Sequence, residues 1–211
     1  MIDTDKLLEI SNTLWDKSRD EYAMIFPDED AYKDIFDYRQ LHSKIVAGLA
    51  IEMFDNYYES IFTTPPDNYK SSLYLACLLH DIKKLNKKHN KVGAKYVLSN
   101  KNLINDNYCD TNLIFTLINY HSADKKGTDL EYINEIKNLH DNIKLLVLFI
   151  RLSDKLSKPL IKSNYKKISP KDIDAILNKI KMNSKEILAF NIDLNSLIIT
   201  IERSFKDKYC N

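Results

Sequence analysis

The chain has little glycine, proline or cysteine. Only 3 Gly and 5 Pro occur among 211 residues, so few obligatory turns interrupt it. The 3 cysteines, Cys77, Cys109 and Cys210, lie far apart and form no CxxC pair. This spacing excludes a dense disulfide framework and is typical of reduced thiols in a cytoplasm.

Long apolar runs are also missing. The longest, residues 145–150, is far shorter than the roughly 20 residues that a helix needs to span a bilayer. Residues 1–5 are acidic where a signal peptide would be basic. We therefore expect a soluble, cytoplasmic protein.

Charge of either sign is not in surplus. Lys and Arg number 31 and Asp and Glu 30, which gives a net charge of +1 and argues against a broad nucleic-acid-binding face. The run at residues 83–88 is locally basic, and we interpret its outer lysines as solvated. Lys84 could instead bind phosphate, because it follows the His80-Asp81 pair closely.

Apolar residues recur at helical spacing along nearly the whole chain, which predicts an all-α protein. Thr63-Thr64-Pro65-Pro66 marks the end of the long second helix, and Ser169-Pro170-Lys171-Asp172 marks the start of the seventh. The last segment is ambiguous, since Leu197–Ile201 alone could form a strand. The predicted helices cover Leu7–Trp15, Tyr38–Ile61, Tyr69–Ile82, Val92–Leu98, Thr111–Tyr120, Asp141–Leu156, Asp172–Ile180 and Leu194–Phe205.

Several polar residues lie on helix faces that should be buried. Asp154 shares a face with Val147 and Ile150, where an unpaired carboxylate would carry a heavy desolvation penalty. It therefore needs a cation, either a basic side chain or a metal ion. The other residues of this kind are His42, His80, Asp81 and His121.

Each of these positions has a simpler interpretation when taken alone. A single histidine on an apolar face is more often a hydrogen-bonded core residue than a metal ligand. However, only 5 histidines occur, and four of them lie at or beside such positions; we interpret the fifth, His140, as structural. One shared cation would satisfy the carboxylates and the imidazole lone pairs together.

The chain resembles the HD-domain metal-dependent phosphohydrolases. The resemblance rests on His42 in Arg-Gln-Leu-His-Ser, on His80-Asp81 in Leu-Leu-His-Asp-Ile, and on Asp154 in Arg-Leu-Ser-Asp-Lys-Leu. It covers roughly residues 38–157 and implies an HD-domain helical bundle over residues 1–160. A helical C-terminal extension, residues 161–211, would pack on the same domain. Two positions depart from the pattern, because Lys83 replaces a common glycine and Ser153 a common alanine.

Two further histidines resemble the ligands of HD subfamilies that bind two metal ions. They are His89 in His-Asn-Lys-Val-Gly-Ala and His121 in Tyr-His-Ser-Ala-Asp. The resemblance implies that Asp81 bridges a second ion held by these histidines. It assigns the first ion to His42, His80, Asp81 and Asp154. Imidazole and carboxylate ligands suit Mn, Fe, Co, Ni or Zn, and Mg is possible.

Residues 89–100 and 145–156 also resemble the helical C-terminal domain of the exopolyphosphatase and guanosine-pentaphosphate phosphatase family. In that family the catalytic site lies in a separate N-terminal region. The resemblance therefore implies a free-standing relative of the helical domain.

The expected function is hydrolysis of a nucleotide or other small phosphate ester or anhydride by a metal-activated hydroxide. Asp81 and Lys84 would be catalytic, Lys84 and Lys125 would bind substrate phosphate, and Arg39 could also bind it. For Arg39 and Arg151 we favour a role in holding Asp154 and its neighbours. Symmetrical hydrolysis of a dinucleoside polyphosphate and a catalytically silent nucleotide-sensing module remain alternatives. We expect a small phosphorylated partner, no membrane and no nucleic acid; the oligomeric state is not indicated.

Overall fold

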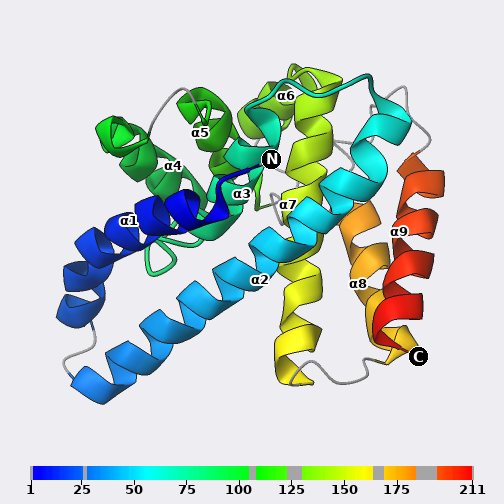
Figure 1. Ribbon diagram of the computed structural model, residues 1–211. Coiled ribbons are helices and arrows are strands. Elements are labelled where there is room, and N and C mark those ends of the chain that lie inside the picture. Colours follow the sequence, from blue (N-terminus) through cyan, green and yellow to red (C-terminus); the bar gives the residue numbers. More distant parts are fainter. Residues whose placement is uncertain are drawn as a thin grey trace.

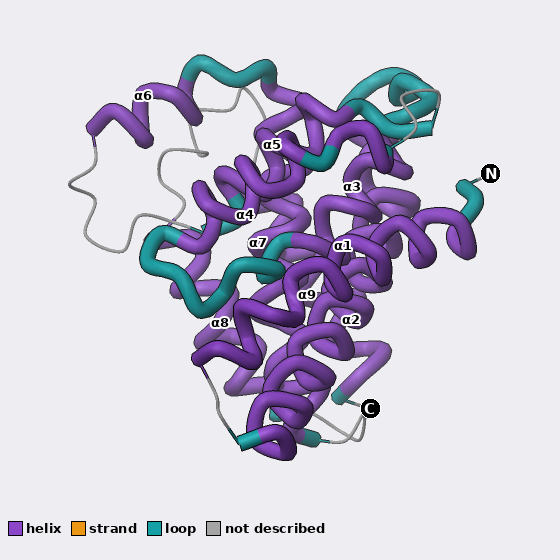
Figure 2. The backbone as a smooth tube through the Cα atoms, turned by 90° about the vertical axis from the view of Figure 1, so that its left-hand side faces the viewer, coloured by secondary structure: helices purple, strands orange, loops and turns teal. Residues whose placement is uncertain are grey.

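The computed structural model describes residues 2–25, 28–104, 108–122, 130–163, 169–183 and 194–210. Within these ranges every regular element is helical, which confirms the all-α prediction (Figure 1, Figure 2). The elements are α1 (Thr4–Ile25), α2 (Glu29–Ile61), α3 (Tyr69–Leu79), α4 (His89–Ser99), the 3-10 turn η1 (Lys101–Leu103), α5 (Thr111–Tyr120), α6 (Leu130–Lys137), α7 (Asp141–Lys162), α8 (Pro170–Asn183) and α9 (Leu194–Tyr209).

Two long helices, α2 and α7, form the frame of the molecule. α2 crosses in front of α7 and packs most extensively against α7 and α3 (Figure 1). α4 packs on α5, and α3 packs on both α5 and α1. The longest apolar run of the sequence, residues 145–150, lies in α7 and is completely buried. Burial of this run places the middle of α7 at the centre of the core.

Several predicted helix ends were wrong. α2 begins at Glu29 rather than Tyr38, because Phe36 extends its apolar stripe and packs edge-on against Trp15 of α1. α3 ends at Leu79 rather than Ile82, and hydrogen-bonded turns follow it. α7 continues beyond Leu156 to Lys162 with a proline in its last turn.

Other differences concern whole elements. α6 was not predicted, since its sequence is short and, among the side chains that the structure describes in it, the buried apolar ones are Tyr132 and Ile136. The last segment is the helix α9 and not a strand, because residues 197, 201 and 205 recur at helical spacing and are all buried.

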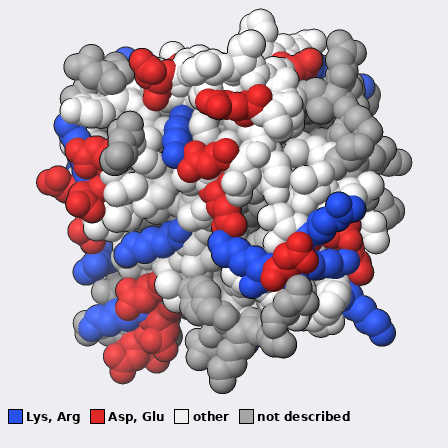
Figure 3. Space-filling view, turned by 45° about the vertical axis from the view of Figure 1, so that its right-hand side comes forward, with Lys and Arg blue, Asp and Glu red and all other residues white. Residues whose placement is uncertain are grey.

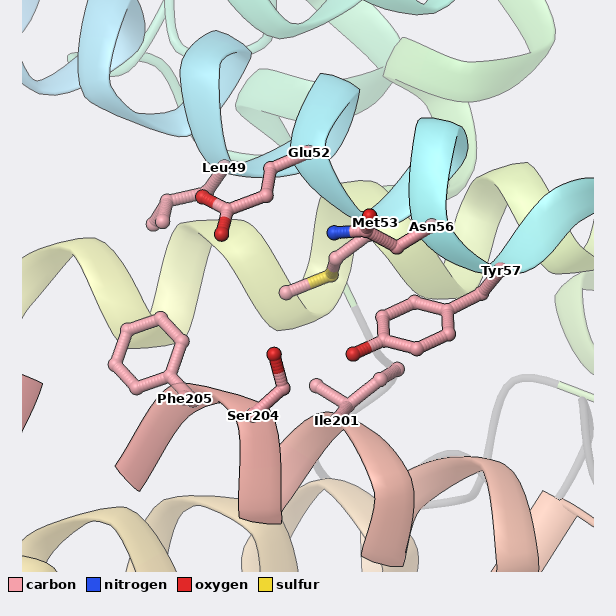
Figure 4. A pocket seen from close by; sticks show the side chains of 8 residues that line it. All are labelled: Leu49, Glu52, Met53, Asn56, Tyr57, Ile201, Ser204 and Phe205. Carbon is pink, nitrogen blue, oxygen red and sulfur yellow. The ribbon is translucent and has the colours of Figure 1, made fainter. Parts of the chain in front are cut away.

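The C-terminal helices pack beside the frame. α8 contacts α7 and α9, and Lys208 of α9 forms an ion pair with Glu52 of α2 at 2.7 Å. A small pocket remains between α2 and α9 (Figure 4). It is lined by Leu49, Glu52, Met53, Asn56, Tyr57, Ile201, Ser204 and Phe205, none of which is a candidate metal ligand.

The surface carries both signs of charge. Figure 3 shows acidic and basic side chains interspersed on one face, in keeping with the net charge of +1. In the part of the chain that the structure describes, no helix is both long and apolar enough to cross a membrane.

Candidate metal centre

The six predicted ligands come from five separate places in the fold and meet in one cluster. His42 lies within α2 and Asp154 within α7, the two frame helices. His80 and His121 directly follow the last residues of α3 and α5, and His89 is the first residue of α4. Asp81 lies in the turn after α3. The packing of α2 and α3 on α7, and of α5 on α3, therefore brings these side chains together.

One group of donors surrounds Asp154. Its Oδ1 atom lies 3.1 Å from Nε2 of His42 and 3.8 Å from Nε2 of His80. One donor atom from each of these three residues lies within 4.8 Å of the others, and none of the side chains is more than 6% exposed. The fold therefore brings together His42 and Asp154, which are the first and the last candidate ligands in the sequence.

A second group surrounds Asp81. Its Oδ1 atom lies 3.4 Å from Nε2 of His89, 3.6 Å from Nε2 of His121 and 3.7 Å from Nε2 of His80. The Nε2 atoms of His89 and His121 are 3.2 Å apart. Two nitrogen ligands of one ion, each bonded at about 2.1 Å, lie roughly 3.0–3.4 Å apart. The spacing of these two imidazoles is therefore that of two ligands of one ion.

Backbone hydrogen bonds orient two of the imidazoles. Nδ1 of His80 donates to the carbonyl of Cys77, and Nδ1 of His121 donates to that of Ile118, each at 2.7 Å. The Nε2 atoms are then directed at the carboxylates. This pattern is typical of metal-binding histidines, whose other ring nitrogen is held by a carbonyl or carboxylate. Nε2 of His80 is buried and has no hydrogen-bond partner among the described residues.

The protonation states favour cation binding. Burial lowers the pKa of His42 and His121, and burial together with the neighbouring His121 and Lys84 lowers that of His89 to about 3. These imidazoles are therefore neutral at pH 7 and keep a lone pair. Burial opposes ionisation of Asp81 and Asp154, yet the surrounding histidines and lysines hold the pKa of both carboxyl groups well below the usual range.

His80 behaves differently from the other histidines. Burial acts to lower its pKa, but the carboxylates of Asp81 and Asp154 outweigh burial and raise it. In the absence of a metal ion, His80 is thus the imidazole of this cluster that retains a proton most strongly. A divalent ion among these donors would displace that proton.

Four basic side chains surround the two carboxylates. Arg39 Nη1 lies 3.4 Å from Asp81 Oδ2, and Lys84 Nζ lies 2.9 Å from Asp81 Oδ1. Lys84 Nζ also lies 3.1 Å from Nε2 of His89. On the other side, the ammonium groups of Lys155 and Lys158 lie 2.6 and 3.8 Å from Asp154. The centre is therefore bordered by cations where it approaches solvent.

Arg39 and Arg151 contact different parts of the cluster. Arg39 contacts Asp81, as expected for a residue that holds the cluster in place. Arg151 donates to the carbonyl of Tyr120 at 2.8 Å and so holds the residue before His121. Lys125 lies outside the described residues.

Lys83, which stands where many HD proteins have glycine, is directed away from the centre. Its buried ammonium forms an ion pair with Glu21 of α1 and lies 3.9 Å from the centre of the Tyr96 ring of α4. The substitution therefore adds a link among α1, α4 and the turn, and it leaves the donor set unchanged.

Sequence reasoning missed three residues of the centre. In the sequence, Lys155 and Lys158 resemble ordinary surface lysines. Nothing in the sequence around them indicates that both contact the Asp154 side chain. Ser157 contacts Nδ1 of His42 at 3.1 Å across 115 residues of sequence. A contact this distant in sequence leaves no local pattern to find.

The donor set fits a metal ion on chemical grounds. It combines imidazole nitrogens, those of His42, His89 and His121 being neutral at pH 7, with ionised carboxylates, the mixture that borderline divalent ions prefer. The unpartnered Nε2 of His80 also needs a partner, since a buried polar atom without one is costly.

Comparison with known proteins gives one match. Residues 31–195 match the family described as Ppx/GppA phosphatase, domain III, and this range includes all six candidate ligands. Neither the curated proteins nor the solved structures contain a match. The match covers well over half of the 211 residues, and the chain therefore belongs to the Ppx/GppA phosphatase domain III family.

Proposed function

We propose that this protein is a metal-dependent phosphohydrolase of the HD type, acting on a nucleotide or another small phosphate ester or anhydride. Membership of a phosphatase family supports hydrolysis of phosphate compounds in general. The observation that carries the proposal is the convergence of four imidazole Nε2 atoms on two buried carboxylates, with Nε2 of His80 left without a partner.

The side chains divide into two overlapping donor sets. His42, His80, Asp81 and Asp154 would hold one divalent ion, and Asp81, His89 and His121 a second. Asp81 can serve both because its two oxygens approach different neighbours: Oδ1 lies near His89, His121 and His80, while Oδ2 is nearest to Arg39 and His42. When bound, such ions would lower the pKa of a water molecule and offset the charge of a phosphoryl group.

The remaining side chains would position the substrate and move protons. Lys84 and Arg39 contact Asp81 from the more exposed side and present N–H groups to phosphoryl oxygens that approach the same carboxylate. Lys84 would donate a hydrogen bond to the departing oxygen and stabilise its developing charge. The candidate metal ligands behind these basic residues are mostly buried and exclude bulk water, which strengthens the electrostatic contacts of Lys84 and Arg39.

Two alternatives differ in their products. Cleavage of a dinucleoside polyphosphate would use the same donors and give two nucleotides. A nucleotide sensor would bind its ligand without turnover, and it is favoured by the limitation of the family match to a single helical domain.

The test combines metal analysis with a substrate panel. Purified protein should contain about one or two transition ions per chain and should hydrolyse members of a panel of nucleotides, dinucleotides and phosphoesters with Mn or Co. Asp81→Ala should abolish turnover, and Asp154→Asn should lose at least one ion. His140→Ala, which changes the exposed histidine outside the cluster, is the control and should keep both.

The outcomes separate the candidates. Tight nucleotide binding with no turnover in any metal would identify a sensor. Protein that takes up no metal, and whose stability does not change when metal is added, would contradict the proposal.

A further inference from the structure

Lys155 and Lys158 form a pair on the solvent side of the candidate metal centre. They are three residues apart on α7 and therefore share a face of the helix. Their side chains are 44% and 46% exposed, yet both ammonium groups are directed at the buried carboxylate of Asp154. The pair thus lies between the donor cluster and solvent, on the Asp154 side.

The ionic contacts of the centre leave it rich in positive charge. Asp81 and Asp154 supply two negative charges, and the structure gives them four basic partners: Arg39, Lys84, Lys155 and Lys158. The four basic residues form two pairs: Arg39 and Lys84 contact Asp81, whereas Lys155 and Lys158 contact Asp154. A divalent ion that took up the carboxylate oxygens would compete with the ammonium groups and add further positive charge.

We propose that Lys155 and Lys158 form a second anion subsite, which binds the phosphate next to the one held at the metal centre. This inference rests on the proposed function and specifies which substrates that site prefers. A metal ion that occupies Asp154 would weaken its ion pairs with the two ammonium groups, which could then bind another anion at the same place. A second phosphate of one substrate supplies it, with the first phosphate held beside Asp81 by Arg39 and Lys84. The site therefore favours ligands with two linked phosphates over those with one.

A purely structural role for the two lysines makes a different prediction. If they only neutralise Asp154, their removal should alter metal affinity or stability and weaken the binding of one-phosphate and two-phosphate ligands equally. A subsite instead produces selective loss. The geometry fits a subsite, because the ammonium groups of both lysines lie within 4 Å of the same carboxylate and are therefore close enough to bind one anion together.

The experiment compares two probes that the enzyme does not cleave. Inorganic phosphate and methylenediphosphonate are titrated calorimetrically into metal-loaded protein, after its metal content has been measured. The variants are Lys155→Gln, Lys158→Gln and the double change. Lys162→Gln, at an exposed lysine farther along the same helix, is the matched control. The double Lys→Arg variant tests whether charge alone restores binding, and melting curves verify that each variant folds.

We expect the double Gln variant to bind diphosphonate roughly 10- to 100-fold more weakly than the wild type, because charge-assisted hydrogen bonds are lost. Phosphate affinity should change by less than about threefold, and Arg at both positions should restore diphosphonate binding. Equal affinity of the wild type and the double Gln variant for diphosphonate would overturn the inference, whatever the metal content. Equal weakening of both probes would also overturn it. Selective loss of diphosphonate binding in a protein without turnover would support the subsite and contradict the proposed hydrolysis.

Discussion

Ser157 lies on the same helix as Asp154 and contacts His42 of the facing helix. Its hydroxyl donates to the backbone carbonyl of Asp154 at 2.8 Å, so its oxygen can accept from Nδ1 of His42 at 3.1 Å. With the proton on Nδ1, Nε2 of His42 presents a lone pair to the Asp154 carboxylate, 3.1 Å away. Two facing lone pairs require a shared cation, and Ser157 thereby selects the tautomer that binds one.

Ser157→Ala should lower metal affinity by roughly 10- to 100-fold, the usual effect of removing a partner that orients a metal-binding histidine. The free energy of unfolding of the metal-free protein should fall by only about 1 kcal/mol, the net value of an ordinary hydrogen bond. Competition between the protein and a chelating dye would measure the metal affinity.

Ser60→Ala is the matched control, because Ser60 makes the same type of bond to the carbonyl three residues earlier but is exposed and contacts no histidine in the structure. It should leave metal affinity unchanged. Equal metal affinity of the Ser157→Ala variant and the wild type would show that Ser157 does not orient His42.

Most of the candidate ligands could be predicted because each places a polar group on or at the end of an apolar helix face, as Asp154 does beside Ile150, whereas His89 was identified by the resemblance alone. The residues that support them could not. Ser157 and Lys155 occupy positions where serine and lysine are common, and their roles depend on contacts with His42 and Asp154. Arg151 was recognised as important, but its partner, the carbonyl of Tyr120, lies on a helix whose position the sequence does not encode locally.

At the scale of the helix, α5 is held at its start by a side-chain cap. Asp110 accepts hydrogen bonds from the backbone N–H groups of Asn112 and Leu113 at 2.8 and 3.1 Å. Its own N–H donates to Ser72 Oγ of α3 at 2.8 Å. The cap fixes the N-terminal end of α5 against α3, and His121 follows the other end of the same short helix.

Asp110→Ala should reduce the free energy of unfolding by about 0.5–2 kcal/mol, because two backbone donors lose their acceptor. Asp110→Asn should restore most of this, since asparagine is an equally good cap. Chemical denaturation of the metal-free proteins would measure both. If alanine and asparagine destabilise equally, the side-chain cap is not what stabilises this end of α5.

Helix cores were easier to predict than helix ends. α5 was predicted with the correct bounds because Asp110 and the residues after Tyr120 mark both ends. α2 was predicted too short, because the segment before Tyr38 is mostly polar and Phe36 alone does not make a helical pattern there. Phe36 is buried against Trp15 of α1. Tertiary packing thus decided the boundary where the local sequence was ambiguous.

At the scale of the whole molecule, the candidate metal centre places histidines with shifted pKa values in the core, and this makes stability depend on pH. The lowered pKa values of His42, His89 and His121 mean that the folded protein resists protonation at these sites, whereas the unfolded chain takes up protons near pH 6.5. Their contribution to stability is therefore complete above pH 6.5 and is lost as the pH falls below it. The raised pKa of His80 acts oppositely: its contribution is present below pH 6.5 and is lost as the pH rises through the folded value.

The carboxylates act in a separate range. Because the pKa values of Asp81 and Asp154 are lowered, their contribution is present above the usual carboxyl pKa and is lost only as the pH falls below about 4. Between pH 7 and pH 5, a fall in pH therefore reduces stability through His42, His89 and His121 and increases it through His80. Each of the three contributes at most about 2 kcal/mol over this interval.

The metal-free protein should accordingly lose free energy of unfolding between pH 7 and pH 5, and the contribution of His89, with its pKa of about 3, is up to about 2 kcal/mol. Denaturant titrations in the presence of a chelator would measure this loss. His121→Asn should flatten the dependence, since it removes one buried imidazole, whereas His140→Ala, at an exposed site, should leave the slope unchanged. A free energy of unfolding that stays constant or rises as the pH falls over this interval would show that the buried imidazoles are not held neutral. The same result would remove the argument that their lone pairs are free for a metal ion at pH 7.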